Sequence, residues 1–81
     1  MKKQPLIIKR HKEIGELLFN IKEQLINVDD KMFRDLPEYN DLTTTLAVAL
    51  GSVGILRERM DTIYRKNHSG NYDRKIYFPM R

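Results

Sequence analysis

Five basic side chains could together hold a phosphorylated ligand, although they come from two distant parts of the sequence. Arg10 and Lys12 belong to the first twelve residues, whereas Arg57, Arg59 and Arg65 lie in the second half. Lysine and arginine bind phosphate through their charge, and the planar guanidinium of arginine can donate two parallel hydrogen bonds to it. The chemistry that these residues indicate is the binding of an anion.

Residues that could catalyse a reaction or hold a metal do not form a recognisable pattern. His11 and His68 are the only histidines, and neither has the spacing of a metal ligand. Glu13 and Glu16 are typical of a helix surface rather than of an acid and base pair in a cleft. The GSVG motif at residues 51–54 has no strand before it, as a phosphate-binding loop would require. We therefore expect no enzyme, no cofactor and no metal, with both histidines at solvated positions.

The length and composition indicate one small domain. A chain of 81 residues is only marginally stable alone, and the absence of cysteine removes both disulfides and thiolate zinc sites. A chain without cysteine suits the cytoplasm. The apolar patch near the start is too short for a signal peptide, and the uncharged residues 46–56 fall far below the roughly 20 residues that span a membrane. We expect these residues to be buried against protein and expect no membrane partner.

Two amphipathic helices account for most of the chain. Apolar residues recur at three- and four-residue steps over residues 9–28, which predicts a helix there, followed by a short helical turn over residues 30–36. Pro37 suits the first turn of a second helix that runs to about residue 66. Its apolar residues follow a heptad pattern: Tyr39, Leu42, Leu46, Ala49, Val53, Leu56, Met60 and Ile63. The two helices should pack as an antiparallel hairpin in an all-α fold.

The hairpin domain, residues 1–66, is expected to be followed by a tail over residues 67–81. Asparagine, glycine and serine in NHSGNYDRK end the second helix, and KIYFPM has the aromatic composition of a short extended segment. This extended tail could pack on its own hairpin or reach a neighbouring chain.

The side of the second helix opposite the heptad pattern is small and uncharged. It carries Thr44, Ala47, Val48, Gly51, Gly54 and Ile55. Each glycine costs about 1 kcal/mol relative to alanine inside a helix, a cost that is usually tolerated where two backbones approach closely. Unprotected apolar surfaces usually mark contacts, so we predict a homo-oligomer that packs through these six residues. Alternatively, the glycines could kink the helix or leave room for Phe19 or Phe33.

Charge is segregated along the chain. Residues 1–12 contain five bases and no acid, residues 13–41 contain eight acids and three bases, and residues 42–81 contain seven bases and three acids. In an antiparallel hairpin, the start of the first helix lies beside the end of the second. One end should therefore be basic and the loop end acidic, which favours an anionic partner. For any single residue, a solvated or paired surface charge is the alternative explanation.

Two segments resemble the small phage-encoded anti-CBASS sponge proteins. They are ELLFNIKEQL at residues 16–25 and GSVGILRER at residues 51–59, within a match over about half of the chain. The resemblance implies a compact helical homo-oligomer that sequesters a cyclic oligonucleotide signal between its subunits, without cleavage, in the cytoplasm of the host cell. It also implies that Lys22 and Arg57 contact phosphates. No tyrosine precedes the first helix to stack on a base, and the stacking could pass instead to Tyr64, Tyr72 or Tyr77.

Two other functions fit the same sequence. A helical adaptor or inhibitor would dock the Gly51 side of the second helix on a larger host protein. A non-specific nucleic-acid-binding protein would use the basic end and bind long strands with a steep salt dependence. The second function has less support, because no helix-turn-helix spacing is readable.

Overall fold

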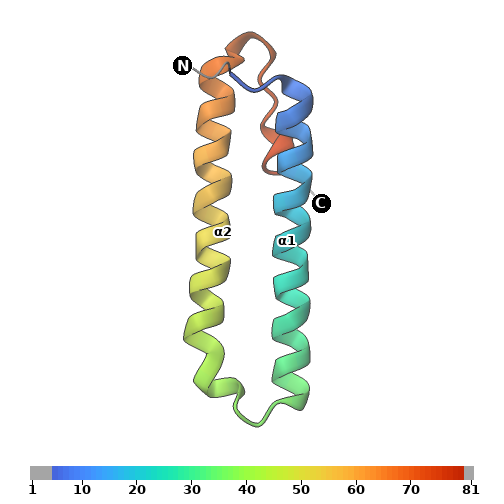
Figure 1. The fold of residues 1–81 in the computed structure, drawn as a ribbon, viewed down its shortest axis with the longest axis vertical. Coiled ribbons are helices and arrows are strands. Elements are labelled where there is room, and N and C mark those ends of the chain that lie inside the picture. The colour runs from blue at the N-terminus through green and yellow to red at the C-terminus, as the bar shows by residue number, and fades with distance from the viewer. Residues whose placement is uncertain (1–4, 80–81) are drawn as a thin grey trace.

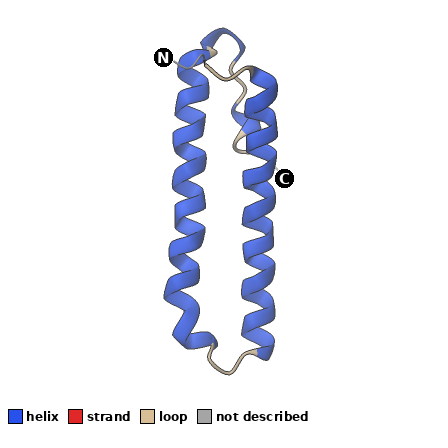
Figure 2. Ribbon diagram, viewed as in Figure 1, coloured by secondary structure: helices blue, strands red, loops and turns tan. Residues whose placement is uncertain are grey.

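Two long antiparallel helices form the molecule (Figure 1). The computed structural model describes residues 5–79. Helix α1 spans Ile8–Asp35 and helix α2 spans Tyr39–Asn67, and the molecule measures 50 × 31 × 15 Å. Figure 2 shows only helices and loops in the described part of the chain, so the predicted all-α helical hairpin is confirmed.

Helix α1 is longer than predicted. It continues past residue 28 and absorbs the separate turn expected over residues 30–36. Asp29, the first residue after the predicted end of this helix, lies within α1, and its Oδ1 accepts a hydrogen bond of 2.7 Å from the Tyr39 hydroxyl at the start of α2. This contact supplies a partner to the aspartate without a local turn.

The proline at position 37 sets the connection between the helices. Leu36 has an extended backbone with φ −104° and ψ 113°, which is the conformation favoured immediately before a proline. The helix α2 then begins at Tyr39 rather than at Pro37 and ends at Asn67, close to the predicted end.

The face of α2 that meets α1 rotates away from the predicted heptad pattern toward the C-terminus. Leu56 and Ile63 are exposed, whereas Arg57, Asp61 and Tyr64 are buried. A straight α-helix drifts by about 20° per heptad relative to a strict seven-residue repeat, so a seam drawn over three heptads no longer faces its partner. The prediction that Leu56 and Ile63 belong to the core is therefore wrong, and Leu42 at the start of the same pattern is also exposed.

The C-terminal segment packs on its own hairpin, which is one of the two alternatives that the sequence leaves open, but it does so in short helical turns rather than as an extended tail. It contains two short 3-10 turns, η1 over Ser69–Asn71 and η2 over Arg74–Ile76, and η2 lies beside α1 (Figure 1). Tyr77 is fully buried. The buried apolar residues are Leu18, Tyr64 and Tyr77, packed against Ile8, Ile14, Met60, Tyr72, Ile76 and Phe78.

Candidate functional site: the basic tail pole

The end of the hairpin that carries the C-terminal segment is called here the tail pole, and it comprises residues 5–18 and 57–79. It holds nine basic and five acidic side chains, a net charge of +4. The opposite part, residues 19–56, holds three basic and six acidic side chains, a net charge of −3. The antiparallel packing of α1 and α2 therefore brings together the two basic segments that lie far apart in the sequence.

Arg57 lies inside the tail pole rather than on its surface. Its Nε and Nη2 donate hydrogen bonds of 3.0 and 2.7 Å to the carbonyl oxygen of Tyr77. Its Cζ lies 5.0 Å from the centre of the Phe78 ring, and only 9% of the residue is exposed. In these contacts Arg57 fastens the C-terminal segment to α2.

The other predicted ligand residues do not converge on one point of a single subunit. Arg10 and Lys12 are exposed on the first turns of α1, and Arg10 is paired with Glu13 at 2.7 Å. Arg59 and Arg65 are exposed on α2. Because residues two apart in a helix lie about 200° apart, Arg59 faces away from Arg57. Lys22 is half-buried in the middle of α1, outside the tail pole.

A buried histidine joins three segments of the tail pole. His11 is fully buried, and its Nδ1 lies 2.6 Å from the Tyr77 hydroxyl. Its ring contacts the ring of Tyr64 at a centroid distance of 4.9 Å and that of His68 at 5.6 Å. His68 Nε2 lies 2.6 Å from the carbonyl oxygen of Leu6, so it holds the segment before α1. The expectation that both histidines lie at solvated surface positions is therefore wrong for His11.

The remaining tyrosines also contact partners within the pole. The Tyr72 hydroxyl donates to both carboxylate oxygens of Asp61, at 2.8 and 2.9 Å. The Tyr64 hydroxyl donates to the carbonyl oxygen of Asn71 and accepts from the backbone N–H of Asp73, both at 3.0 Å. In this arrangement the aromatic residues suggested for base stacking serve to close the pole.

Burial controls the protonation of this cluster. Desolvation, with a smaller contribution from the charge of His68, lowers the pKa of His11 from its ordinary value of 6.5. Burial, followed by the nearby Asp61 and Tyr64, raises the pKa of Tyr77 to about 12. His11 Nε2 is buried without a hydrogen-bond partner, so a protonated imidazole would bury one more unsatisfied donor. The folded pole therefore holds a neutral His11 and a protonated Tyr77.

We expect acid to destabilise the fold through His11. The unfolded chain takes up this proton first as the pH falls, because the folded pKa is the lower one. The free energy of unfolding is then at its full value above pH 6.5 and decreases as the pH falls through the folded pKa. Urea unfolding at a series of pH values from 7.5 to about 5 measures the slope. His11→Gln should flatten this slope, whereas His68→Gln should leave most of it; an equal slope in wild type and His11→Gln would contradict the assignment.

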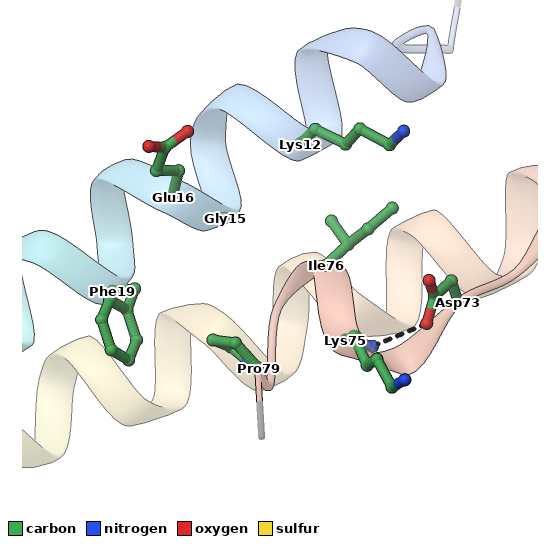
Figure 3. A pocket seen from close by; sticks show the side chains of 8 residues that line it. All are labelled: Lys12, Gly15, Glu16, Phe19, Asp73, Lys75, Ile76 and Pro79. Atoms are coloured by element: carbon green, nitrogen blue, oxygen red, sulfur yellow. Dashed lines mark hydrogen bonds between the residues drawn. The ribbon is translucent and has the colours of Figure 1, made fainter. Parts of the chain in front are cut away.

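An open pocket of about 280 Å³ lies where η2 meets α1 (Figure 3). Its lining combines two lysines, two carboxylates and apolar side chains: Lys12, Gly15, Glu16, Phe19, Asp73, Lys75, Ile76 and Pro79. Gly15 is buried, and a Cβ at this position would overlap the carbonyl oxygen of Ile76. The close approach of η2 to α1 therefore requires glycine. Sequence reasoning missed Gly15, although a glycine inside an amphipathic helix was an available signal.

The predicted oligomer interface lies on the outer side of α2. Thr44, Ala47, Val48, Gly51 and Ile55 are exposed and Gly54 is half-buried. A Cβ built at Gly51 or Gly54 would meet no atom within 4 Å, so these glycines do not leave room for Phe19 or Phe33 in this chain. The alternative that the glycines leave room for these rings is therefore wrong, whereas a kink of the helix and self-association through these six residues stay predictions.

Comparison with protein families, with curated proteins and with solved structures finds no match to this chain. Among residues 5–79, no group of three or more histidine, aspartate or glutamate side chains is placed to hold a metal ion. No helix in the same part of the chain is long and apolar enough to cross a membrane.

Proposed function

We propose that this chain is a non-enzymatic binding protein that sequesters a phosphorylated ligand at its tail pole. The observation that carries the proposal is the division of charge, with +4 at the tail pole and −3 in the rest of the described chain. Such a field attracts an anion to one end of the molecule. Lys12, Arg65 and Lys66 are exposed there and make no ion pair among the described residues.

The buried cluster supports this function because it fixes the surface that carries these cations. Arg57 and His11 tie the C-terminal segment to α2 and α1. A rigid site loses less conformational entropy when it binds. A ligand with several phosphates can contact more than one of these separate cations. A cyclic oligonucleotide immune signal, as the resemblance to phage sponge proteins implies, is a ligand of this kind.

Native mass spectrometry with cyclic di- and trinucleotides tests the proposal. We expect whole-number nucleotide adducts that are released unchanged. Lys12→Glu combined with Arg65→Glu should weaken binding about 10-fold or more, because each phosphate contact through an exposed cation contributes on the order of 1 kcal/mol. Lys31→Glu is the matched control, since Lys31 is exposed near the opposite end of the molecule.

Three results would contradict the proposal. They are the absence of any adduct, an equal loss of binding in the Lys31→Glu control, and tight binding of long nucleic-acid strands without preference for small nucleotides. The last result would indicate the general nucleic-acid function instead.

A further inference from the structure

One broad side of the hairpin carries large apolar side chains that the C-terminal segment does not cover. The turn η2 docks against Gly15 of α1, and the loop before it contacts Asp61 of α2. Leu17 is two positions after Gly15 on α1, and Ile63 is two positions after Asp61 on α2. Each therefore lies about 200° around its helix from the residue that meets the C-terminal segment, on the opposite flank of that helix. Both side chains are exposed. The two helices therefore present apolar residues on the side away from the C-terminal segment.

A groove shows that these two flanks open to the same side. It has a volume of about 220 Å³ and is lined almost entirely by apolar side chains from both helices: Val28, Met32, Leu42, Thr45, Leu46 and Ala49. Steps of four and seven residues keep a helical residue on one flank. Leu17 and Ile21 therefore continue the flank of Val28, and Leu56 and Ile63 continue the flank of Ala49.

We name this surface the open face and define it by six residues, Leu17, Ile21, Val28, Leu42, Leu56 and Ile63. Each of them is between 38% and 61% exposed. They extend from Leu17 to Val28 on α1 and from Leu42 to Ile63 on α2. Side chains of this size on a continuous surface are typical of a contact with another protein.

Charge at the edge of the open face identifies its occupant. Asp41 and Arg59 lie on one flank of α2, linked through Thr45 and Ser52 by steps of four, seven and seven residues. Both charges are exposed, and neither has an ion-pair partner among the described residues. They are opposite in sign and stand near opposite ends of α2. An identical helix packed antiparallel to α2 would place each Arg59 beside an Asp41.

We propose that the open face binds a second copy of this chain in an antiparallel arrangement with two-fold symmetry. The tail pole of each subunit then lies beside the acidic loop end of the other, and the four helices form a bundle. A two-fold interface is self-complementary, so one Asp41 and Arg59 pair is made twice. In this arrangement, Leu17 and Leu56 of one subunit face the apolar groove of the other subunit, which Val28 and Leu42 line. This inference assigns Arg59 to a contact between chains rather than to a ligand, and it does not rest on ligand binding. It replaces the prediction that the chains associate through the outer side of α2.

Two neighbouring glutamate substitutions locate the interface. Leu56 and Ile55 are similarly exposed, at 49% and 54%, but Leu56 lies on the open face and Ile55 on the outer side of α2. Sedimentation equilibrium should give twice the chain mass of 9.7 kDa for wild type and Ile55→Glu, and the single chain mass for Leu56→Glu. Circular dichroism checks that both variants keep their helices. A monomeric wild type, or dissociation by Ile55→Glu rather than by Leu56→Glu, would overturn the proposal.

A charge reversal tests the antiparallel direction. Asp41→Arg and Arg59→Asp should each weaken the dimer by about 10-fold, because each places like charges together twice. The double variant should recover most of the wild-type affinity. Added salt should weaken the wild-type dimer, since these exposed pairs are screened. If the loss of dimer affinity in the double variant equals the sum of the losses in the two single variants, the antiparallel pairing is excluded.

Discussion

Replacement of Gly15 by alanine is expected to destabilise the protein, whereas replacement of Gly51 by alanine is expected to stabilise it. A Cβ at Gly15 would overlap the carbonyl oxygen of Ile76, so η2 must move away from α1. Overpacking of this kind costs about 1 to 3 kcal/mol. A Cβ at Gly51 meets no neighbour within 4 Å, so alanine there should keep its helix advantage of about 1 kcal/mol.

The two variants form a matched pair, because the same methyl group is added inside a helix in both. Urea unfolding followed by circular dichroism, at one protein concentration, measures the free energy of unfolding for each. Equal stabilisation by both variants would show that η2 does not rest on Gly15. Destabilisation by Gly51→Ala would instead indicate that the outer side of α2 is packed against another chain, as the sequence predicts.

The substitution Arg57→Ala is expected to release the C-terminal segment and to lower stability by about 2 to 4 kcal/mol. It removes two hydrogen bonds to the Tyr77 carbonyl oxygen, leaves that oxygen without its donor, and removes the guanidinium from the Phe78 ring. Hydrogen exchange should report the change first in the amides of Ile76 and Phe78, which bond within the segment itself.

Arg57→Lys and Lys66→Ala serve as controls for this prediction. Lysine keeps the charge but cannot donate the forked pair of hydrogen bonds, so it should restore only part of the stability. Lys66 is exposed near the end of α2, and its loss should change the free energy of unfolding by no more than about 0.5 kcal/mol. Unchanged exchange in Arg57→Ala would refute the anchoring role.

The anchoring role of Arg57 affects how ligand-binding experiments are interpreted. The resemblance to sponge proteins implies that Arg57 contacts a phosphate, but its guanidinium already binds the Tyr77 carbonyl. A loss of ligand binding in Arg57→Ala would therefore be ambiguous, because the variant also detaches the C-terminal segment. Lys12 and Arg65 are exposed and separate the two effects more cleanly.

Periodicity in the sequence correctly predicted the helices but not their inner surface near the tail pole. The spacing of apolar residues predicts two amphipathic helices, and a short connection makes them antiparallel. The same spacing assigned Leu56 and Ile63 to the core, where the structure places Arg57 and Asp61 instead. A pattern of apolar residues cannot identify polar residues that become buried. Leu56 and Ile63, like Leu42 of the same pattern, instead form part of the open face.

The sequence by itself determined the all-helical hairpin and the division between a basic and an acidic end. Local periodicity predicts the two helices, and their short connection makes them antiparallel, which brings the two distant basic segments to one end. Only the tertiary structure decided that His11 and Arg57 are buried. Their partner Tyr77 lies 66 and 20 residues away, respectively. Burial of a polar group is favourable only when another segment satisfies its hydrogen bonds. That segment here is the folded-back C-terminus, and its docking depends on the absence of a side chain at Gly15.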